Sequence, residues 1–332
     1  ENASENYLRS CLPKLKDGYS NPYYFEASRN GDFYCSINKK RGDYACEIRG
    51  CVEGVESVTV PKYIGLYEIT SFAFFNCTSL KSVKVPEGFT YSGSYFNCDN
   101  LTNVELPQTV TELGSFSYCR SLKNIKIPSG VTEIGSYAFS NCISLESIEM
   151  PNCINIYDYA FKGSDNVKII EIIEGRANFY GHISPNAFDD IDNITVTMWA
   201  SVNSSFLPNN IKTKIEKLII NGGESINNCV FEDCSSLSSV EISNGITSIG
   251  YRAFSNCSRL TSIIIPSSVT SIGSEAFLNC SNMTIIYCEA ESQPSGWDSW
   301  WNAIKITTEI IRPGVGLQTA EFCPVEWGYK SS

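Results

Sequence analysis

The sequence repeats Val131-Thr-Glu-Ile-Gly-Ser-Tyr-Ala-Phe-Ser-Asn-Cys142 with few changes at residues 246–257 and at residues 269–280. Each copy is followed by a short run of alternating apolar residues that a proline closes, as from Leu260 to Pro266. Self-similarity at a fixed period is typical of repeat architectures, in which each unit buries its apolar face only against its neighbours. The sequence therefore predicts a solenoid made of stacked, similar coils.

The leading apolar residue of each run marks one coil, and neighbouring coils are 25, 21, 21, 23, 22, 27, 21, 22, 23 and 23 residues apart. This register continues from residue 165 to residue 228, where the motif itself has decayed. We therefore expect about eleven rungs of one right-handed coil over residues 55–289, between an N-terminal cap with a β-hairpin (1–54) and a C-terminal cap (290–332). The leading residues are Val55, Leu80, Leu101, Leu122, Leu145, Val167, Ile194, Ile215, Leu237, Leu260 and Met283.

Each rung divides into a short strand and a return path. β-Branched residues favour the strand, and proline ends it because proline cannot donate a hydrogen bond to the neighbouring strand. Stacking the rungs would align these strands in a parallel sheet on the concave side of the solenoid. It would also align the Ala-Phe pairs, such as Ala138 and Phe139, in an internal column.

Seven cysteines lie three residues before a leading apolar residue: Cys77, Cys98, Cys119, Cys142, Cys234, Cys257 and Cys280. We expect them to form a buried ladder of free thiols, because stacked strands about 4.8 Å apart with parallel side chains fit disulfide geometry poorly. The other eight lie off this ladder: Cys11, Cys35, Cys46, Cys51, Cys153, Cys229, Cys288 and Cys323. Among these, Cys35 and Cys46 are the preferred disulfide because they flank an expected hairpin turn at Asn38 to Asp43.

The pattern V-T-x-I-G-x-x-A-F-x-x-C-x-x-L-x-x-I-x-I-P, over roughly residues 52–290, resembles the BspA-type leucine-rich repeats, also called the Treponema pallidum class. The segments Gln293–Trp297 and Cys323–Tyr329 also resemble the C-terminal ends of such proteins. The resemblance implies a leucine-rich-repeat solenoid of the β-rich α/β class, surface display or secretion by bacteria, and for some members adhesion. It brings no catalytic residues. The 21-residue rungs around Cys98 and Cys119 lack two residues before the phenylalanine position, so we expect a thinner return side there.

Charge and composition restrict the partners. The formal net charge is -11, which disfavours nucleic acids and anionic membranes as partners. No apolar stretch has the length of a membrane span, and the N-terminus lacks a basic region followed by a hydrophobic one. We therefore expect no direct membrane insertion and an extracellular or cell-surface protein whose signal sequence has been removed. With one histidine and no nucleophile elbow, phosphate loop or HExxH motif, we expect no enzyme, metal or cofactor.

The strand residue four after the leading position is expected to point outward, and this column carries the candidate binding residues. Its first half alternates in sign through Lys84, Glu105, Lys126 and Glu149. Opposite charges on neighbouring strands stabilise a sheet modestly. We favour a solvated charge ladder over a ligand site for these four residues.

The second half of the column is apolar, with Met198, Ile219, Ile264 and Tyr287, beside Ile169 and Ile285 in the neighbouring outward column. One hypothesis is an apolar strip that binds a protein or peptide. The other is a slipped register that would turn Val196 and Met198 inward. The sequence leaves both open.

Two further motifs have plain structural explanations. Arg41-Gly42-Asp43 matches the integrin-binding tripeptide at an expected hairpin tip, but three residues are a weak signal and turn chemistry explains them better. Trp297, Trp300 and Trp301 could stack on a sugar, yet we favour a role in covering the apolar end of the last rung.

These features together predict a monomeric surface or secreted scaffold that recognises a protein or peptide through its concave face, such as a host matrix protein or another cell surface. The alternative is a carbohydrate-binding surface protein of a gut bacterium.

Overall fold

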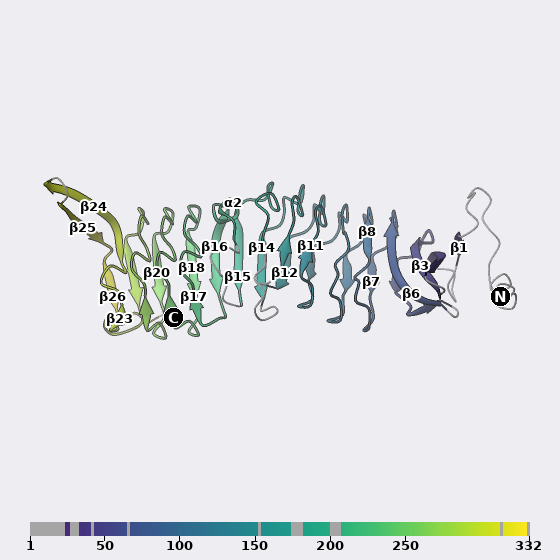
Figure 1. Ribbon diagram of the computed structural model, residues 1–332, viewed down its shortest axis with the longest axis horizontal. Helices are drawn as coiled ribbons and strands as arrows, with labels where there is room; N and C mark the ends of the chain where they lie inside the picture. Colours follow the sequence, from purple (N-terminus) through teal and green to yellow (C-terminus); the bar gives the residue numbers. More distant parts are fainter. Residues whose placement is uncertain are drawn as a thin grey trace. The chain divides into compact units, whose positions relative to one another are not determined.

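The computed structural model describes residues 24–26, 33–40, 43–64, 67–151, 154–173, 182–199, 207–312 and 315–330 (Figure 1). The chain forms a solenoid of parallel β-strands, and within these ranges helix is confined to α2 (Asn209–Lys212). A strand lies at each of the eleven expected rung positions. The chain divides into two compact units, residues 1–145 with 159–164, and residues 146–158 with 165–332.

The first unit contains the first four rung strands. They are β4 (Ser57–Thr59), β7 (Ser82–Lys84), β9 (Asn103–Glu105) and β10 (Asn124–Lys126). The strands β4, β7 and β9 pair in parallel, with Val58, Val83 and Val104 in register. The return path carries β5 (Tyr63–Ile64), β6 (Tyr67–Phe75), β8 (Ser94–Phe96) and β11 (Glu133–Ile134). Each rung thus has the short strand and the return path that the repeat predicts.

An antiparallel segment precedes the first rung. It contains β1 (Tyr24–Glu26), β2 (Phe33–Lys40) and β3 (Asp43–Cys51). The pairing of Lys40 with Asp43 closes the expected hairpin, and β3 then pairs in parallel with β6. The register places Cys35 opposite Ile48 rather than opposite Cys46. The side chain of Cys35, and with it the preferred Cys35–Cys46 disulfide, lies outside the described residues.

The second unit contains the remaining rung strands. They are β12 (Ser147–Pro151), β14 (Ile169–Ile173), β15 (Ile194–Met198), β16 (Ile215–Ile220), β18 (Ser239–Ile242), β20 (Ser262–Ile265) and β22 (Ile285–Cys288). The return path carries β13 (Asn155–Ile156), β17 (Ser225–Ile226), β19 (Ser248–Ile249), β21 (Ser271–Ile272) and β23 (Gly296–Trp297). Parallel pairing joins β12 through β18, β20 with β22, and β17 through β23. Two faces of the coil therefore carry sheet in this unit.

The coil continues past residue 290 for one further rung. Its return strand is β23, and its sheet strand is β26 (Val325–Trp327), which pairs in parallel with β22. Between them the antiparallel strands β24 (Ala303–Arg312) and β25 (Val315–Phe322) pair only with each other (Figure 1). The last rung is therefore interrupted by a hairpin.

A column of aromatic rings fills the core of each unit. In the first unit the rings of Phe74, Tyr95, Phe116, Phe139 and Phe161 stack with successive centroid distances of 5.5, 4.8, 5.2 and 5.2 Å. In the second unit Phe231, Phe254 and Phe277 stack at 5.5 and 5.7 Å. Offset aromatic stacking adds to the stabilisation that burial provides. The internal column expected from the repeat is confirmed.

Tryptophans cover the end of this column, as predicted. The ring of Trp301 lies edge-on against Phe277 at 6.2 Å and is buried, as is Trp297. The indole N–H of Trp297 donates to the carbonyl of Val269 at 3.1 Å, so its polar atom is satisfied in the core. Trp300 is half-buried. The capping role is confirmed for Trp297 and Trp301.

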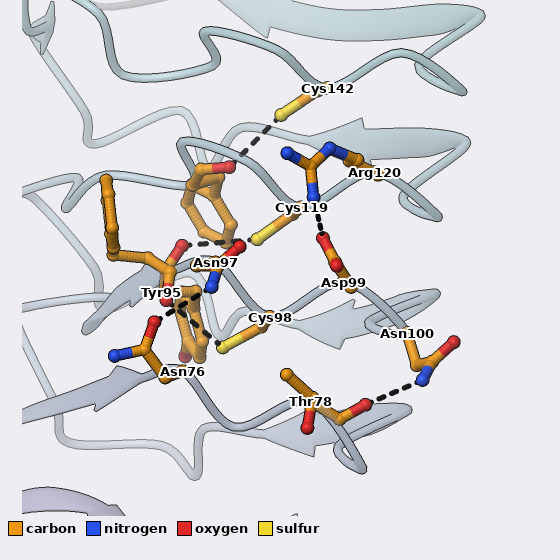
Figure 2. A network of polar contacts seen from close by, with 12 residues as sticks. Asn76, Thr78, Tyr95, Asn97, Cys98, Asp99, Asn100, Cys119, Arg120 and Cys142 are labelled. Atoms are coloured by element: carbon orange, nitrogen blue, oxygen red, sulfur yellow. Dashed lines mark hydrogen bonds and ion pairs between the residues drawn. The ribbon is translucent and has the colours of Figure 1, made fainter.

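The cysteine ladder is buried, and no disulfide joins its members. Five of its seven thiols donate to the carbonyl of an aromatic-column residue one rung earlier, as Cys98 does to Phe74 and Cys142 does to Phe116, both at 3.1 Å (Figure 2). Cys119, Cys257 and Cys280 repeat this contact at 3.2, 3.4 and 3.2 Å. The predicted ladder of free thiols is confirmed.

The assignment of Cys51 and Cys323 to positions off the ladder needs correction. Cys51, at the end of β3, interacts with the thiol of Cys77. Cys323, which follows the inserted hairpin, is buried close enough to Cys280 to influence the pKa of its own thiol. The spacing of cysteines in the sequence did not predict either position. Cys51 lies in the segment before the first rung and Cys323 follows the inserted hairpin, and neither segment has the repeat pattern.

Candidate binding surface

The sheet strands of the second unit present two outward columns, defined by the strand register. The first column contains Ser147, Ile169, Thr195, Lys217 and Ser239, and the second contains Glu149, Glu171, Thr197, Ile219 and Glu241. On β20 and β22 the first column continues as Ser262 and Ile285, and the second continues as Ile264 and Tyr287. Residues between the columns, such as Ile170 and Leu218, are buried. These outward columns are the surface available to a partner.

The expectation that Met198 points outward is wrong. Met198 is 4% exposed and Val196 is fully buried, so both belong to the core. The register shifts between Ile194 and Thr195 relative to β16, and this shift puts Thr197, itself only 9% exposed, in the register position where Met198 was expected. Because side chains alternate along a strand, a slip of one residue exchanges the buried and exposed sets. The slipped-register hypothesis holds for this strand.

The same slip exposes a tryptophan that the sequence reasoning missed. Trp199 follows β15, and its N–H donates to the carbonyl of Ile172 at 2.8 Å, which places it beside Ile173. Its side chain is 49% exposed, and that of Ile169 is 40% exposed. Ile173 and Ile219 are half-buried nearby on β14 and β16. We call Ile173, Trp199 and Ile219 the Trp199 patch; Ile169 pairs with Thr195, four residues before Trp199, and lies outside this patch.

A second apolar group lies on β20 and β22. Ile264 and Tyr287 are neighbours in the second column, and Ile285 lies in the first. The ring of Tyr287 packs against Tyr329 with centroids 4.6 Å apart. We call Ile264, Ile285 and Tyr287 the Tyr287 group. Part of its apolar surface is therefore already covered by this chain.

The two apolar groups do not form one continuous strip. The strand between them, β18, presents Ser239 and Glu241. A Lys217 Nζ atom lies 2.5 Å from a carboxylate oxygen of Glu241, so an ion pair crosses both columns at this point. The predicted strip is thus divided, and the Trp199 patch is its more exposed half.

Carboxylates border the Trp199 patch on one side. Glu149 and Glu171 occupy neighbouring positions in the second outward column, on the paired strands β12 and β14. Like charges placed opposite each other destabilise a sheet. These carboxylates add to the negative charge around the patch.

The charged ladder of the first unit is exposed, and two of its members form an ion pair with each other. The Nζ atom of Lys84 lies 3.1 Å from a carboxylate oxygen of Glu105, with both side chains more than half exposed. Lys126 is also exposed. An exposed ion pair of this kind contributes about 0–1 kcal/mol. This geometry agrees with the solvated charge ladder favoured from the sequence.

The integrin-type tripeptide lies largely outside the described residues. Arg41 and Gly42 lie outside the described residues. Asp43 is the first residue of β3, and its side chain also lies outside the described part.

A row of exposed aromatic rings on the return side of the first unit was also missed. Phe75 and Phe96 are 49% and 41% exposed, and Phe96 contacts Tyr118 at 5.5 Å between centroids. Other rungs have the buried residues Ser140 or Ser255 two places before the ladder cysteine. The phenylalanine rings at this place remain exposed instead. The F-N-C triplets at residues 75–77 and 96–98 were the available signal.

The described ranges contain neither a cluster of metal ligands nor a membrane-spanning helix. No group of three or more His, Cys, Asp or Glu side chains there could hold a metal ion. No helix there has the length and apolar character needed to span a bilayer.

Comparison with known proteins places the repeat in a family. The sequence model of the BspA type leucine rich repeat region, in six copies, matches residues 49–168, 91–211 and 209–316. These ranges together run from residue 49 to residue 316 and include all the rung strands except the last, β26. A search of curated proteins finds no significant match.

Several solved structures are similar to this chain. A leucine-rich repeat protein from T. pallidum is 17% identical, with a TM-score of 0.39 over 77% of this chain and 90% of that one. A leucine rich cell surface protein from Faecalibacterium prausnitzii is 22% identical, with a TM-score of 0.35 over 82% and 89%. A leucine-rich repeat protein from Bacteroides ovatus is 21% identical, with a TM-score of 0.30 over 80% and 88%.

Proposed function

Because the chain belongs to the family of BspA-type leucine-rich repeat proteins, we propose that it is a secreted or surface-displayed scaffold that binds a protein or peptide. Its binding site is the Trp199 patch together with the neighbouring carboxylates. The partner is a matrix protein or a protein on another cell surface. The proposal assigns the chain no catalytic step.

The observation that carries this proposal is the exposure of Trp199 at 49% beside the half-buried Ile173 of the paired strand. Tryptophan is enriched among the residues that dominate binding energy, since its large rigid side chain buries much area at little entropic cost. The sheet positions its neighbours rigidly, because Thr195, Thr197 and Ile219 are fixed by ladder pairing on both sides. A preformed apolar patch of this kind favours an apolar anchor from the partner.

The surrounding charge indicates which partner fits. The chain has a net charge of -11, and Glu149 and Glu171 stand next to the patch. Complementary charge speeds association and selects partners. We therefore infer that the bound segment carries an apolar or aromatic anchor followed by lysine or arginine.

The carbohydrate alternative has lost its main support. It relied on Trp297, Trp300 and Trp301 as a stacking surface, and two of these three are buried in the core. Protein recognition is accordingly the function that we put forward.

The test is a binding experiment with the full chain. It is screened against a displayed random peptide library, an array of immobilised extracellular-matrix proteins and a glycan array. We expect enriched peptides that combine an apolar anchor with basic residues. Trp199→Ala and Ile219→Asp should each weaken their binding by at least about tenfold, the equivalent of about 1.4 kcal/mol, with circular dichroism unchanged.

The matched control is Ile264→Asp. It introduces the same charge in the same outward column, but in the Tyr287 group. Binding that survives Trp199→Ala and Ile219→Asp but is lost in Ile264→Asp would move the site to the Tyr287 group. Enrichment of glycans alone would contradict protein recognition.

A further inference from the structure

Cys77 differs from the other ladder thiols in its hydrogen bonds. Cys98, Cys119 and Cys142 each donate to a carbonyl of the preceding rung at 3.1–3.2 Å. The sulfur of Cys77 instead accepts the backbone N–H of Cys51 at 3.1 Å, and its own nearest carbonyl contact, to Phe75, is longer at 3.8 Å. Cys77 is therefore held as an acceptor, which suits a thiolate.

Cys51 approaches Cys77 differently from a ladder neighbour. It is the last residue of β3, in the segment before the first rung, and its N–H points at the Cys77 sulfur. Since the N–Cα bond is about 1.46 Å, the Cα atom of Cys51 lies within about 4.6 Å of that sulfur. The thiol of Cys51 also interacts with the thiol of Cys77. The two sulfurs can therefore meet by side-chain rotation, without the parallel alignment that disfavours bonds along the ladder.

The two cysteines also differ in accessibility and in acidity. Cys51 is half-buried, whereas Cys77 is 7% exposed. Hydrogen bonds with the thiols of Cys51 and Cys98 lower the pKa of Cys77 to about 4, despite the opposing effect of burial. Burial instead raises the pKa of Cys142, further along the ladder. The thiolate is the nucleophilic form of cysteine, so the acceptor geometry of Cys77 suits an attack on a neighbouring sulfur.

We propose that Cys51 and Cys77 are a thiol–disulfide exchange site, oxidised by a low-molecular-weight disulfide such as glutathione disulfide. The Cys51 sulfur, after losing its proton, bonds to one sulfur of the small disulfide and releases one small thiol. The Cys77 thiolate then attacks the Cys51 sulfur and releases the second small thiol. Two protein thiols are thereby oxidised to one disulfide, and one external disulfide is reduced to two thiols.

The new bond would fasten the hairpin of β2 and β3 to the first rung. Within the described residues, β3 pairs with the rungs through its parallel ladder with β6, which has a register shift between Cys46 and Glu47. A covalent link at the end of β3 would oppose separation at this point. The site is thus a redox-dependent clasp at the start of the solenoid.

The experiment uses the reduced full chain and glutathione disulfide. After an acid quench and alkylation of remaining thiols, the protein is digested with trypsin without reduction and analysed by mass spectrometry. Cleavage after Arg49, Lys62 and Lys81 gives residues 50–62 and 63–81, each with a single cysteine. We expect these two peptides to appear joined, and to form at least about tenfold faster than any bond between Cys234 and Cys257.

Cys234 and Cys257 are the internal control, since both are buried ladder neighbours and Cys257 donates to the carbonyl of Phe231 in the usual way. Cys51→Ser should abolish the joined peptide while leaving circular dichroism unchanged. The proposal is overturned if Cys77 is found joined to Cys98, if a stable glutathione adduct remains on Cys51, or if the two peptides stay separate in folded protein.

Discussion

At the scale of the residue, the ladder position requires a small buried donor rather than a cysteine as such. Ser164 occupies this place in the rung after Cys142, with its hydroxyl donating to the carbonyl of Phe139 at 2.6 Å. The same oxygen accepts the N–H of Cys142 at 2.9 Å. Cys142 makes the equivalent donation to Phe116. The column therefore satisfies carbonyl groups of the core that water does not reach.

We expect Ser164→Ala to reduce the free energy of unfolding by about 1–3 kcal/mol, because it leaves a buried carbonyl and a buried N–H without their partner. Urea denaturation followed by circular dichroism measures the change. Ser164→Cys restores a donor of the ladder type and should lose less. Equal stability of Ser164→Ala and the natural chain would show that the hydroxyl is not needed.

At the scale of the element, the 21-residue rungs reach their neighbours by a shorter return path. Tyr95 and Phe116 still occupy the aromatic column, although two residues are missing before each. Within this return path the chain lies close to the adjacent rung at Gly114. A Cβ atom there would lie 2.0 Å from the carbonyl oxygen of Gly93.

Gly114→Ala should therefore destabilise the first unit by about 1–3 kcal/mol, since the opposing atom belongs to a backbone and cannot rotate away. Gly135 is the matched control from the next rung, where a Cβ atom would meet nothing within 4 Å. Gly135→Ala should be neutral, or stabilising by up to about 1 kcal/mol. Thermal and urea unfolding of both variants measures the difference, and equal losses would refute the close approach.

At the scale of the whole molecule, acidity is the property most relevant to recognition. Acidic residues number 36 against 25 lysines and arginines. Several cations are already engaged on the surface, as in the pairs Lys81 with Glu56 and Arg120 with Asp99, both at 2.7 Å. The net electrostatic field around the chain is negative and attracts cationic partners. Salt screens this attraction beyond about 10 Å at 0.1 M.

If the proposed function holds, association with a selected basic peptide should slow by about tenfold or more between low and high salt, while dissociation changes less. Stopped-flow kinetics at several ionic strengths measures both rates. The double variant Glu149→Gln with Glu171→Gln should show a smaller salt dependence. An association rate that is constant with salt would argue against electrostatic attraction.

The sequence by itself determined the repeat and its buried columns. Ala-Phe pairs, ladder cysteines and leading residues recur in the same local setting, so each rung specifies its own inward positions without information from distant segments. This is why the eleven strand positions, the stacked rings and the buried thiols were all predictable. The covering of the last rung by Trp297 and Trp301 was predictable for a similar reason, since an apolar end must be hidden from water.

Only the tertiary structure decided which side chains reach the surface. Pairing between β15 and β16 set the shift that buries Met198 and exposes Trp199, and a slip of one residue is invisible when both alternating sets are apolar or small. The ion pair of Lys217 with Glu241 divided the predicted strip, because it joins residues on neighbouring strands. The meeting of Cys51 with Cys77 depends likewise on how β3 packs beside β6. Such contacts arise between segments, and a local pattern does not encode them.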